Sequence, residues 1–596
     1  MKTRTATSAG FAAIWTLLCA VLLALLIFDL LPHFELLTQP ARGDALREAS
    51  NAITACSRFL GVALSMLVAL CALAIPLTAN VYTPKLIELF VADRLNRLVI
   101  GYFVLANAVV LWNDVMLGLS GAEVAARPRA LVCVALTLVA LLSIAPYLLY
   151  VLRFLVPQSI VGRIQREVVA SIDDLGDETD PAEQDQALRR AVTNIQYLGK
   201  VTLRSIQRHD RDVAAEGLQA LEEVFQAYQT RKPYLSPSAL RSSCRDALGL
   251  GPELSLEIER KQAVIEVAIL AELNLLLPVA IRVEVGEVVA QIAALTRHLG
   301  LRVAERGDAG AADMVTLYFN TFLRHALKTR SPDSFYKLVY QYRRFAENVL
   351  ESAPQLSERV AFFLDYYAHQ AVRMGMPYLL NVVAYDLAAL CEAAYERKVH
   401  CRKRLLDLFI ALDRDEPGIL DMPGMVKAQI ILSAKLATTG VEDAAGLLES
   451  ELRKVPEEVL RETFGQIIAA REENFWEIAD RRRHLDHVEP AYRKAVRDLR
   501  KRLTGVDEAG VATMLFMEEA RKEAQLAARK GTREAPRPTP RGPKPAAPQE
   551  PPSEAEREEA PAESSGSGRR ERSEPSPPPP APESAPIDLA DGTGVQ

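Results

Sequence analysis

The sequence lacks the short motifs that mark common enzyme and nucleotide-binding families. It has no phosphate loop of the form G-x-x-x-x-G-K-S/T, no G-x-G-x-x-G after a strand and no G-x-S-x-G nucleophile turn. Gly249-Leu-Gly251 is followed by Pro252 and is typical of a turn. We therefore expect no catalytic residue, no cofactor and a protein that is not an enzyme.

An excess of positive charge and paired metal-binding residues are also missing. The 596 residues carry 70 Lys and Arg against 76 Asp and Glu, whereas nucleic-acid binding needs a basic face. The seven cysteines form no C-x-x-C pair. His484-Leu-Asp-His487 is the best metal-like cluster, but it lies in a charged run typical of a solvated helix end. We predict no nucleic-acid partner and no metal site.

Long apolar runs crowd into the first 156 residues. Four of them approach the roughly 20 residues that cross a hydrocarbon core of about 30 Å: residues 9–28, 59–79, 98–117 and 130–152. The first follows Lys2 and Arg4, as a secretory signal would, but it is too long and has no small-residue cleavage site, so we expect an uncleaved anchor. The Lys and Arg flanks favour both termini in the cytoplasm.

Polar residues concentrate between the second and third runs. Pro84 is expected to end the preceding helix, because its ring removes a donor and restricts Thr83. Charged residues then alternate with apolar ones, a pattern that suits a short helix lying partly among lipid headgroups. We predict a membrane-interface segment that includes Tyr82, Pro84, Lys85, Asp93, Arg94 and Arg97.

The third run contains the polar residues Asn107, Asn113 and Asp114. Ionisable groups inside a span are costly and often functional, so these three residues are candidates for a transport path. The alternative is that Asp114 simply reaches interfacial water at the end of the run, next to Trp112. We favour this second interpretation.

The stretch Tyr82-Thr-Pro-Lys-Leu-Ile-Glu-Leu-Phe-Val-Ala-Asp-Arg-Leu-Asn-Arg-Leu-Val-Ile-Gly-Tyr-Phe103 resembles a segment of an uncharacterised family of bacterial predicted membrane proteins, a domain of unknown function. In that family a Tyr/Phe-Ser/Thr-Pro-Arg/Lys start, a Phe, an Asp-Arg pair and a Gly-x-Phe follow the second span. The resemblance covers roughly residues 45–165. It implies a bacterial inner-membrane location and four spans, and it implies no activity.

From residue 158 the chain reads as consecutive helices with short turns, and almost no stretch alternates as a strand would. We predict stacked helical hairpins of an irregular α-solenoid or a large helical bundle, although no strict repeat period is visible. The aromatics between Phe335 and Tyr367 have helical spacing, which predicts an interhelical core, with a peptide-binding concavity as the alternative.

The predicted fold is therefore all-α. A four-span transmembrane domain (1–157) precedes a membrane-proximal helical hairpin region (158–232) and a solenoid-like domain (233–530). The remaining residues, 531–596, are rich in Pro, Glu, Ser and Arg and poor in aromatics, so we expect a disordered tail.

These features favour an integral inner-membrane protein that acts as a scaffold or sensor, binding protein partners through its cytoplasmic helical domain. An oligomeric ion channel or transporter, with the helical domain as its regulator, is the alternative. An enzyme with unrecognised residues is a third interpretation. The expected partners are the lipid bilayer, a protein and other copies of this chain.

Overall fold

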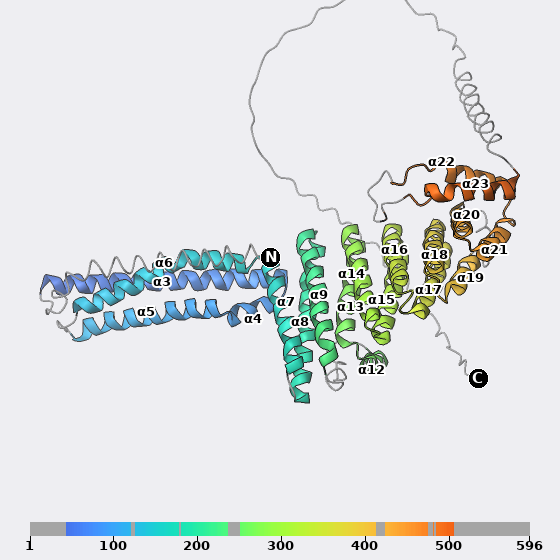
Figure 1. Ribbon diagram of the computed structural model, residues 1–596. Coiled ribbons are helices and arrows are strands. Elements are labelled where there is room, and N and C mark those ends of the chain that lie inside the picture. Colours follow the sequence, from blue (N-terminus) through green and yellow to red (C-terminus); the bar gives the residue numbers. More distant parts are fainter. Residues whose placement is uncertain are drawn as a thin grey trace, which may run out of the picture. The chain divides into compact units, whose positions relative to one another are not determined.

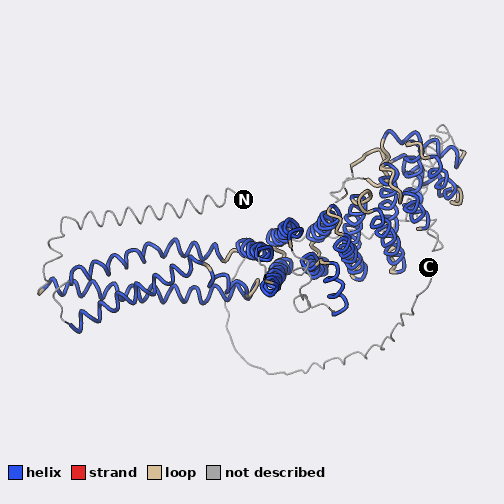
Figure 2. Tube along the Cα trace, turned by 60° about the horizontal axis from the view of Figure 1, so that its bottom comes forward, coloured by secondary structure: helices blue, strands red, loops and turns tan. Residues whose placement is uncertain are grey.

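The computed structural model describes residues 43–120, 126–177, 180–235, 251–412, 423–474, 481 and 484–505. Within these ranges every regular element is a helix and no strand occurs, which confirms the all-α prediction (Figure 2). All of them belong to one compact unit, residues 1–513. The predicted first span, 9–28, and the predicted tail, 531–596, lie outside the described residues and stay predictions.

Three long helices form the N-terminal bundle (Figure 1): α3 (Asp44–Val81), α5 (Arg94–Ser120) and α6 (Ala126–Phe154), which contact one another in pairs. On α3, Ile53, Leu60 and Leu67 repeat at heptad spacing and are buried, whereas Met66 and Leu73 are 74 % and 65 % exposed. Large apolar side chains facing outward suit a lipid environment, because water would penalise them. Each helix is long and apolar enough to cross a membrane.

The remaining helices stack as hairpins. In chain order they are α7 (Pro157–Asp177), α8 (Pro181–Gln207), α9 (Arg211–Arg231), the 3₁₀ turn η2 (Lys232–Tyr234), α12 (Pro252–Lys261), α13 (Val264–Arg282), α14 (Gly286–Glu305), α15 (Ala309–Lys328), α16 (Pro332–Asn348), α17 (Pro354–Arg373), α18 (Tyr378–Glu396), α19 (Arg402–Ala411), α20 (Pro423–Thr438), α21 (Glu442–Leu452), α22 (Glu457–Ala469) and α23 (Pro490–Thr504). Helices α14, α16, α18 and α20 contact in succession as one layer, and α13, α15, α17 and α19 as a second. This arrangement is the predicted solenoid.

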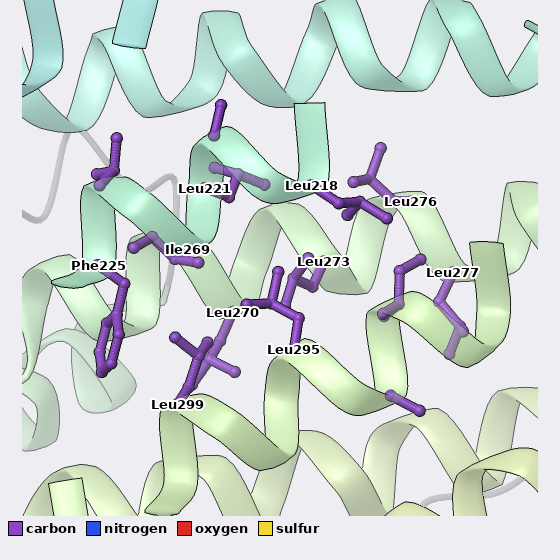
Figure 3. Packing of buried hydrophobic residues seen from close by; sticks show 14 of the residues in the cluster. Leu218, Leu221, Phe225, Ile269, Leu270, Leu273, Leu276, Leu277, Leu295 and Leu299 are labelled. Carbon is purple, nitrogen blue, oxygen red and sulfur yellow. The ribbon is translucent and has the colours of Figure 1, made fainter. Parts of the chain in front are cut away.

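Helix α13 shows why apolar length alone does not identify a membrane span. It is the fourth helix of the described chain that is long and apolar enough to cross a bilayer, yet 72 % of its most apolar window is buried inside the protein. Figure 3 shows Ile269, Leu270 and Leu273 of α13 among leucines and a phenylalanine of α9 and α14. A helix that is apolar on all sides can be a core helix, and α13 lies in the solenoid core.

The links between helices recur in one form. A residue in the left-handed region follows many of the helices: His209, Gln262, Glu284, Gly307, Arg330, Gly375, Lys398 and Gly440. Such a residue ends a helix and turns its last amides back onto free carbonyls. At several links the next helix begins with a cap, as where the Asp308 side chain accepts the amide of Ala311. Short links of this kind bring consecutive helices together as antiparallel neighbours.

Candidate functional site

The break between α3 and α5 lies where the sequence predicts it. Helix α3 ends at Val81, and Pro84 occupies the N-cap of the short helix α4 (Lys85–Ala92). The hydroxyl of Thr83, which is buried, accepts the amide of Lys85 at 3.3 Å. Helix α4 buries Leu86, Leu89 and Phe90 and exposes Ile87 and Val91. The helix therefore has apolar residues both on the side that packs against the protein and on the side that faces outward. This is expected of a helix that lies between a protein core and lipid.

Asp93 connects three helices. Its Oδ1 atom accepts the amides of Leu95 and Asn96 at 3.0 and 3.2 Å, which caps the start of α5. The same atom accepts the hydroxyl of Tyr150 of α6 at 2.8 Å, and Oδ2 accepts Nη1 of Arg163 of α7 at 3.0 Å. One carboxylate thus ties the bundle to the first helix that follows it.

Aromatic rings enclose this ion pair. The guanidinium carbon of Arg163 lies 3.9 Å from the ring centroid of Phe154, and Phe90 of α4 meets Phe154 edge to face at 5.3 Å. A cation over an aromatic face is stabilised by the ring quadrupole, more so when water is excluded. The side chains of Asp93 and Arg163 are 18 % and 21 % exposed. The pair is therefore partly buried, where screening by solvent is reduced.

Lys85 makes a second connection from α4. Its Nζ lies 2.7 Å from Glu88 of the same helix, 3.4 Å from Glu167 of α7 and 5.8 Å from the ring centroid of Tyr197 of α8. Arg208, just after α8, stacks over the ring of Tyr82 at 5.6 Å. Both ends of the break between α3 and α4 therefore contact the solenoid.

The ionisation of these groups is consistent with stable ion pairs. Burial favours the neutral form of Asp93, but the hydrogen bonds from Tyr150, Asn96 and Arg163 outweigh it, and the pKa of Asp93 lies below its usual value. Burial lowers the pKa of Lys85, but the negative charges of Glu88 and Glu167 raise it by more. The pKa of Lys85 therefore lies above its usual value. Both groups are charged at neutral pH.

We name this set of contacts the junction network and define it as Tyr82, Lys85, Asp93, Tyr150, Phe154, Arg163, Glu167, Tyr197 and Arg208. Of the predicted interface residues, Tyr82, Lys85 and Asp93 belong to it and Pro84 shapes the break. Arg94 and Arg97 are exposed on the first turn of α5, outside the network. The network contains no nucleophile next to a base, and its groups can position helices rather than transform a substrate.

The network falls within a region that matches a known family. Residues 6–210 match the family Predicted membrane protein (DUF2254). The match confirms the predicted resemblance to an uncharacterised family of predicted membrane proteins, and it ends in the link between α8 and α9. The bundle and the whole junction network therefore lie in the DUF2254-like region, and most of the solenoid follows it.

Other comparisons add little. No curated protein matches the chain. Among solved structures, a "Circular tandem repeat protein with novel repeat topology and enhanced subunit contact surfaces" is similar over 62 % of this chain and 86 % of its own. The sequence identity is 14 % and the TM-score is 0.26, which supports no conclusion about fold or function.

The candidate transport residues of the DUF2254-like region all lie on α5, with Asn107 seven residues before Asp114. Asp114 accepts the hydroxyl of Thr54 of α3 at 2.8 Å, and the side-chain amide of Asn113 donates to the carbonyl of Val109 at 2.8 Å. Thr54 lies four residues, about 6 Å along the helix, before Arg58, which precedes the apolar run of α3. Asp114 is thus paired near the end of the bundle away from the junction. This position suits the interpretation that Asp114 reaches interfacial water. Asn107 is half-buried.

A second polar site lies on the solenoid. We call the partly exposed side of α14, α16, α18 and α20 the even-helix face. A cavity of about 460 Å³ opens on it, lined by side chains of α16, α18 and α20, by Arg481 and by residues of the segment 484–489. Arg481 donates two hydrogen bonds to Asp386 of α18, at 2.7 and 2.9 Å, and stacks 4.1 Å from the ring centroid of Tyr336. Both charged side chains are buried.

The metal-like cluster takes part in this site without forming a ligand set. Nδ1 of His484 accepts the amide of Asp486 at 3.1 Å, and His487 lies 3.4 Å from Arg493. No group of three or more candidate metal ligands converges in the part of the chain that the structure describes.

The predicted aromatic core is largely present. Phe335, Tyr342 and Phe345 are fully buried, and Tyr342 stacks on Phe319 at 4.6 Å. Phe362 and Tyr366 are exceptions, because 52 % and 48 % of them are exposed on α17. Interhelical packing therefore accounts for the buried rings of this set.

Proposed function

We propose that the protein is a membrane-anchored scaffold or sensor of the bacterial inner membrane, whose solenoid binds a protein partner. The observation that carries this proposal is the junction network, which links α4, α5 and α6 to α7 through partly buried charge. A solenoid held in this way presents its even-helix face at a defined place next to the membrane. Extended solenoid surfaces commonly serve as binding surfaces. The proposal assigns no catalytic activity.

The charge distribution supports a cytoplasmic solenoid and cytoplasmic termini. The bundle end next to the solenoid carries Lys85, Arg94, Arg97, Arg153, Arg163 and Arg166, and the opposite end carries Arg47, Arg58, Arg127 and Arg129. Positive charge is retained preferentially on the cytoplasmic side. A four-span bundle that includes residues 9–28 then has both termini on that side.

Site-specific photocrosslinking in native membranes tests the scaffold function. A crosslinking amino acid replaces Ala389, which lines the cavity on the even-helix face, or Leu317, which is 45 % exposed on α15 in the other layer. We expect a discrete protein partner to be captured from position 389 and not from position 317. Capture from neither position, in cells that contain all natural partners, would refute the scaffold function.

The alternative, an oligomeric channel or transporter, rests on the Thr54–Asp114 contact, which places an ionisable group against a neighbouring helix. It is tested by ion flux through the purified protein in liposomes, comparing the wild type with Asp114→Asn. Flux that the substitution changes would favour transport, with the solenoid as regulator. Absence of flux for several ions at both potentials would favour the scaffold.

A further inference from the structure

Two arginines on the even-helix face make no direct hydrogen bond to a carboxylate of the described residues. Arg297 of α14 donates from Nε to Oε1 of Gln341 at 2.8 Å and from Nη2 to Nε2 of His298 at 2.7 Å. Nδ1 of His298 lies 3.1 Å from Glu222 of α9. If Nδ1 donates to that carboxylate, Nε2 is the acceptor that Arg297 requires, and the ring is neutral. The partners of Arg297 are then both uncharged.

Arg344 of α16 is the second of the pair. Its Nε is buried without a hydrogen-bond partner among the described residues, and the nearest carboxylate, that of Glu347, lies 3.9 Å away. Glu347 is itself engaged by Arg343 and lies 3.9 Å from Arg397. The Arg344 side chain is 43 % exposed and borders the 460 Å³ cavity, so a ligand can reach it.

The two cations affect each other. Arg297 bonds to Gln341, which precedes Arg344 by three residues on α16. Burial lowers the pKa of Arg297 and the positive charge of Arg344 lowers it further, while Tyr340 and Glu222 offset part of this shift. Like charges held side by side are unfavourable unless an anion lies between them. The guanidinium group is well suited to bind a carboxylate through two parallel hydrogen bonds.

The chain itself shows how an acid binds on this face. Asp486 lies in a non-helical segment, and its Oδ2 accepts Nζ of Lys427 of α20 at 2.7 Å. Its Oδ1 accepts the hydroxyl of Tyr385 of α18. An aspartate from outside the two layers is thus held by a cation and a donor of successive helices. Arg297 and Arg344 offer a comparable pair of donors on α14 and α16, and no carboxylate in the described part of the chain hydrogen-bonds to either.

We propose that Arg297 and Arg344 anchor an acidic segment of the partner protein, with one carboxylate held between the two guanidinium groups. This inference rests on the proposed scaffold function and specifies the chemistry of the partner. The cavity next to Arg344 receives the residues that follow the anchored acid. Because one arginine lies on α14 and the other on α16, the bound segment is extended and crosses both helices.

Binding of a fluorescent oligoglutamate peptide to the full-length protein in nanodiscs, followed by anisotropy, tests this site. We expect Arg297→Gln together with Arg344→Gln to weaken binding by about tenfold or more, because two charge-assisted contacts are lost. Arg297→Lys with Arg344→Lys keeps the charge without the planar fork, and we expect an intermediate loss. Arg461→Gln is the matched control, since Arg461 is exposed and already paired with Glu457. An oligolysine peptide should not bind at this site.

Three results would overturn the proposal. One is equal oligoglutamate binding by the wild type and the double glutamine variant. Another is oligoglutamate binding that appears only when four glutamates of the C-terminal stretch, Glu554, Glu556, Glu558 and Glu559, are all replaced by glutamine. The occupant of the arginine site would then be the protein's own acidic stretch and not a partner. The third is undiminished photocrosslinking of the natural partner from position 389 in the double variant. In that last case the scaffold function stands and only the arginine anchor fails.

Discussion

The ion pair between Asp93 and Arg163 should hold the first turns of α7 against the bundle. Asp93→Asn keeps an oxygen that can cap α5 and accept from Tyr150, but it removes the charge that binds Arg163. A charge-assisted hydrogen bond contributes about 1.5–3 kcal/mol, and exposed pairs contribute about 0–1 kcal/mol. At 18 % and 21 % exposure, we expect a coupling energy of about 1–2 kcal/mol between the two side chains.

Hydrogen exchange of the full-length protein in nanodiscs measures this coupling. Asp93→Asn should speed exchange in the first two turns of α7 by roughly five- to thirtyfold, the equivalent of that energy. Exchange in α18 should not change. In a double-mutant cycle with Arg163→Gln, the double variant should be little worse than either single variant. Strictly additive effects, or unchanged α7 exchange in both single variants, would refute the coupling.

The pH dependence of this coupling has a defined sign. The pKa of Asp93 is lowered in the folded protein from a usual value of 3.8. The stabilisation is therefore fully present above that usual value and is lost as the pH falls through the lower folded pKa. The coupling should be constant from pH 8 to about pH 5 and should decline only in stronger acid.

Three further perturbations concern the solenoid. Burial of Glu272 raises its pKa from the usual 4.5 to about 7. The free energy of unfolding should therefore fall by roughly 3 kcal/mol as the pH rises from 4.5 through about 7. Glu272→Gln should abolish this pH dependence in urea unfolding. Gly199→Ala would place a methyl group 1.9 Å from Oε2 of Glu272, so the end of that side chain would have to move. We expect a loss of stability of about 1 kcal/mol or less, because alanine also favours the helix more than glycine does, and Glu272→Ala should remove this loss. Arg481→Gln should lower stability by about 3 kcal/mol by leaving Asp386 buried without its main partner, and Asp386→Asn should recover part of the loss in thermal unfolding.

The local features of the junction were readable from the sequence. Pro84 predicted the break, and the alternation of charged and apolar residues after it predicted a short helix with polar and apolar sides. Both signals act within one or two turns of the chain, where backbone geometry decides the outcome. The partners of Asp93 were not predictable in the same way. Tyr150 and Arg163 follow it by 57 and 70 residues, and no local pattern announces a contact over that distance.

The solenoid likewise has features that the sequence predicted and features that it did not. Helical periodicity with short turns predicted stacked hairpins, and glycines such as Gly307 and Gly375 stand at some of the links. Other links end at residues without special conformational freedom, such as Arg330 and Lys398, and composition alone does not single these out. The pairing of Arg481 with Asp386 spans 95 residues and required the two layers to be assembled.

The sequence by itself determined the all-α class, the apolar bundle, the break at Pro84 and the hairpin succession of the solenoid, because these depend on periodicity and short-range backbone preferences. Only the tertiary structure shows that α13 is a core helix, because its composition suits a membrane span and a protein core equally well. It also decided which charges meet. Asp93 pairs with Arg163, whereas Arg297 and Arg344 make no direct hydrogen bond to a carboxylate of the described residues. Ion pairing depends on distances in space, which helix packing sets.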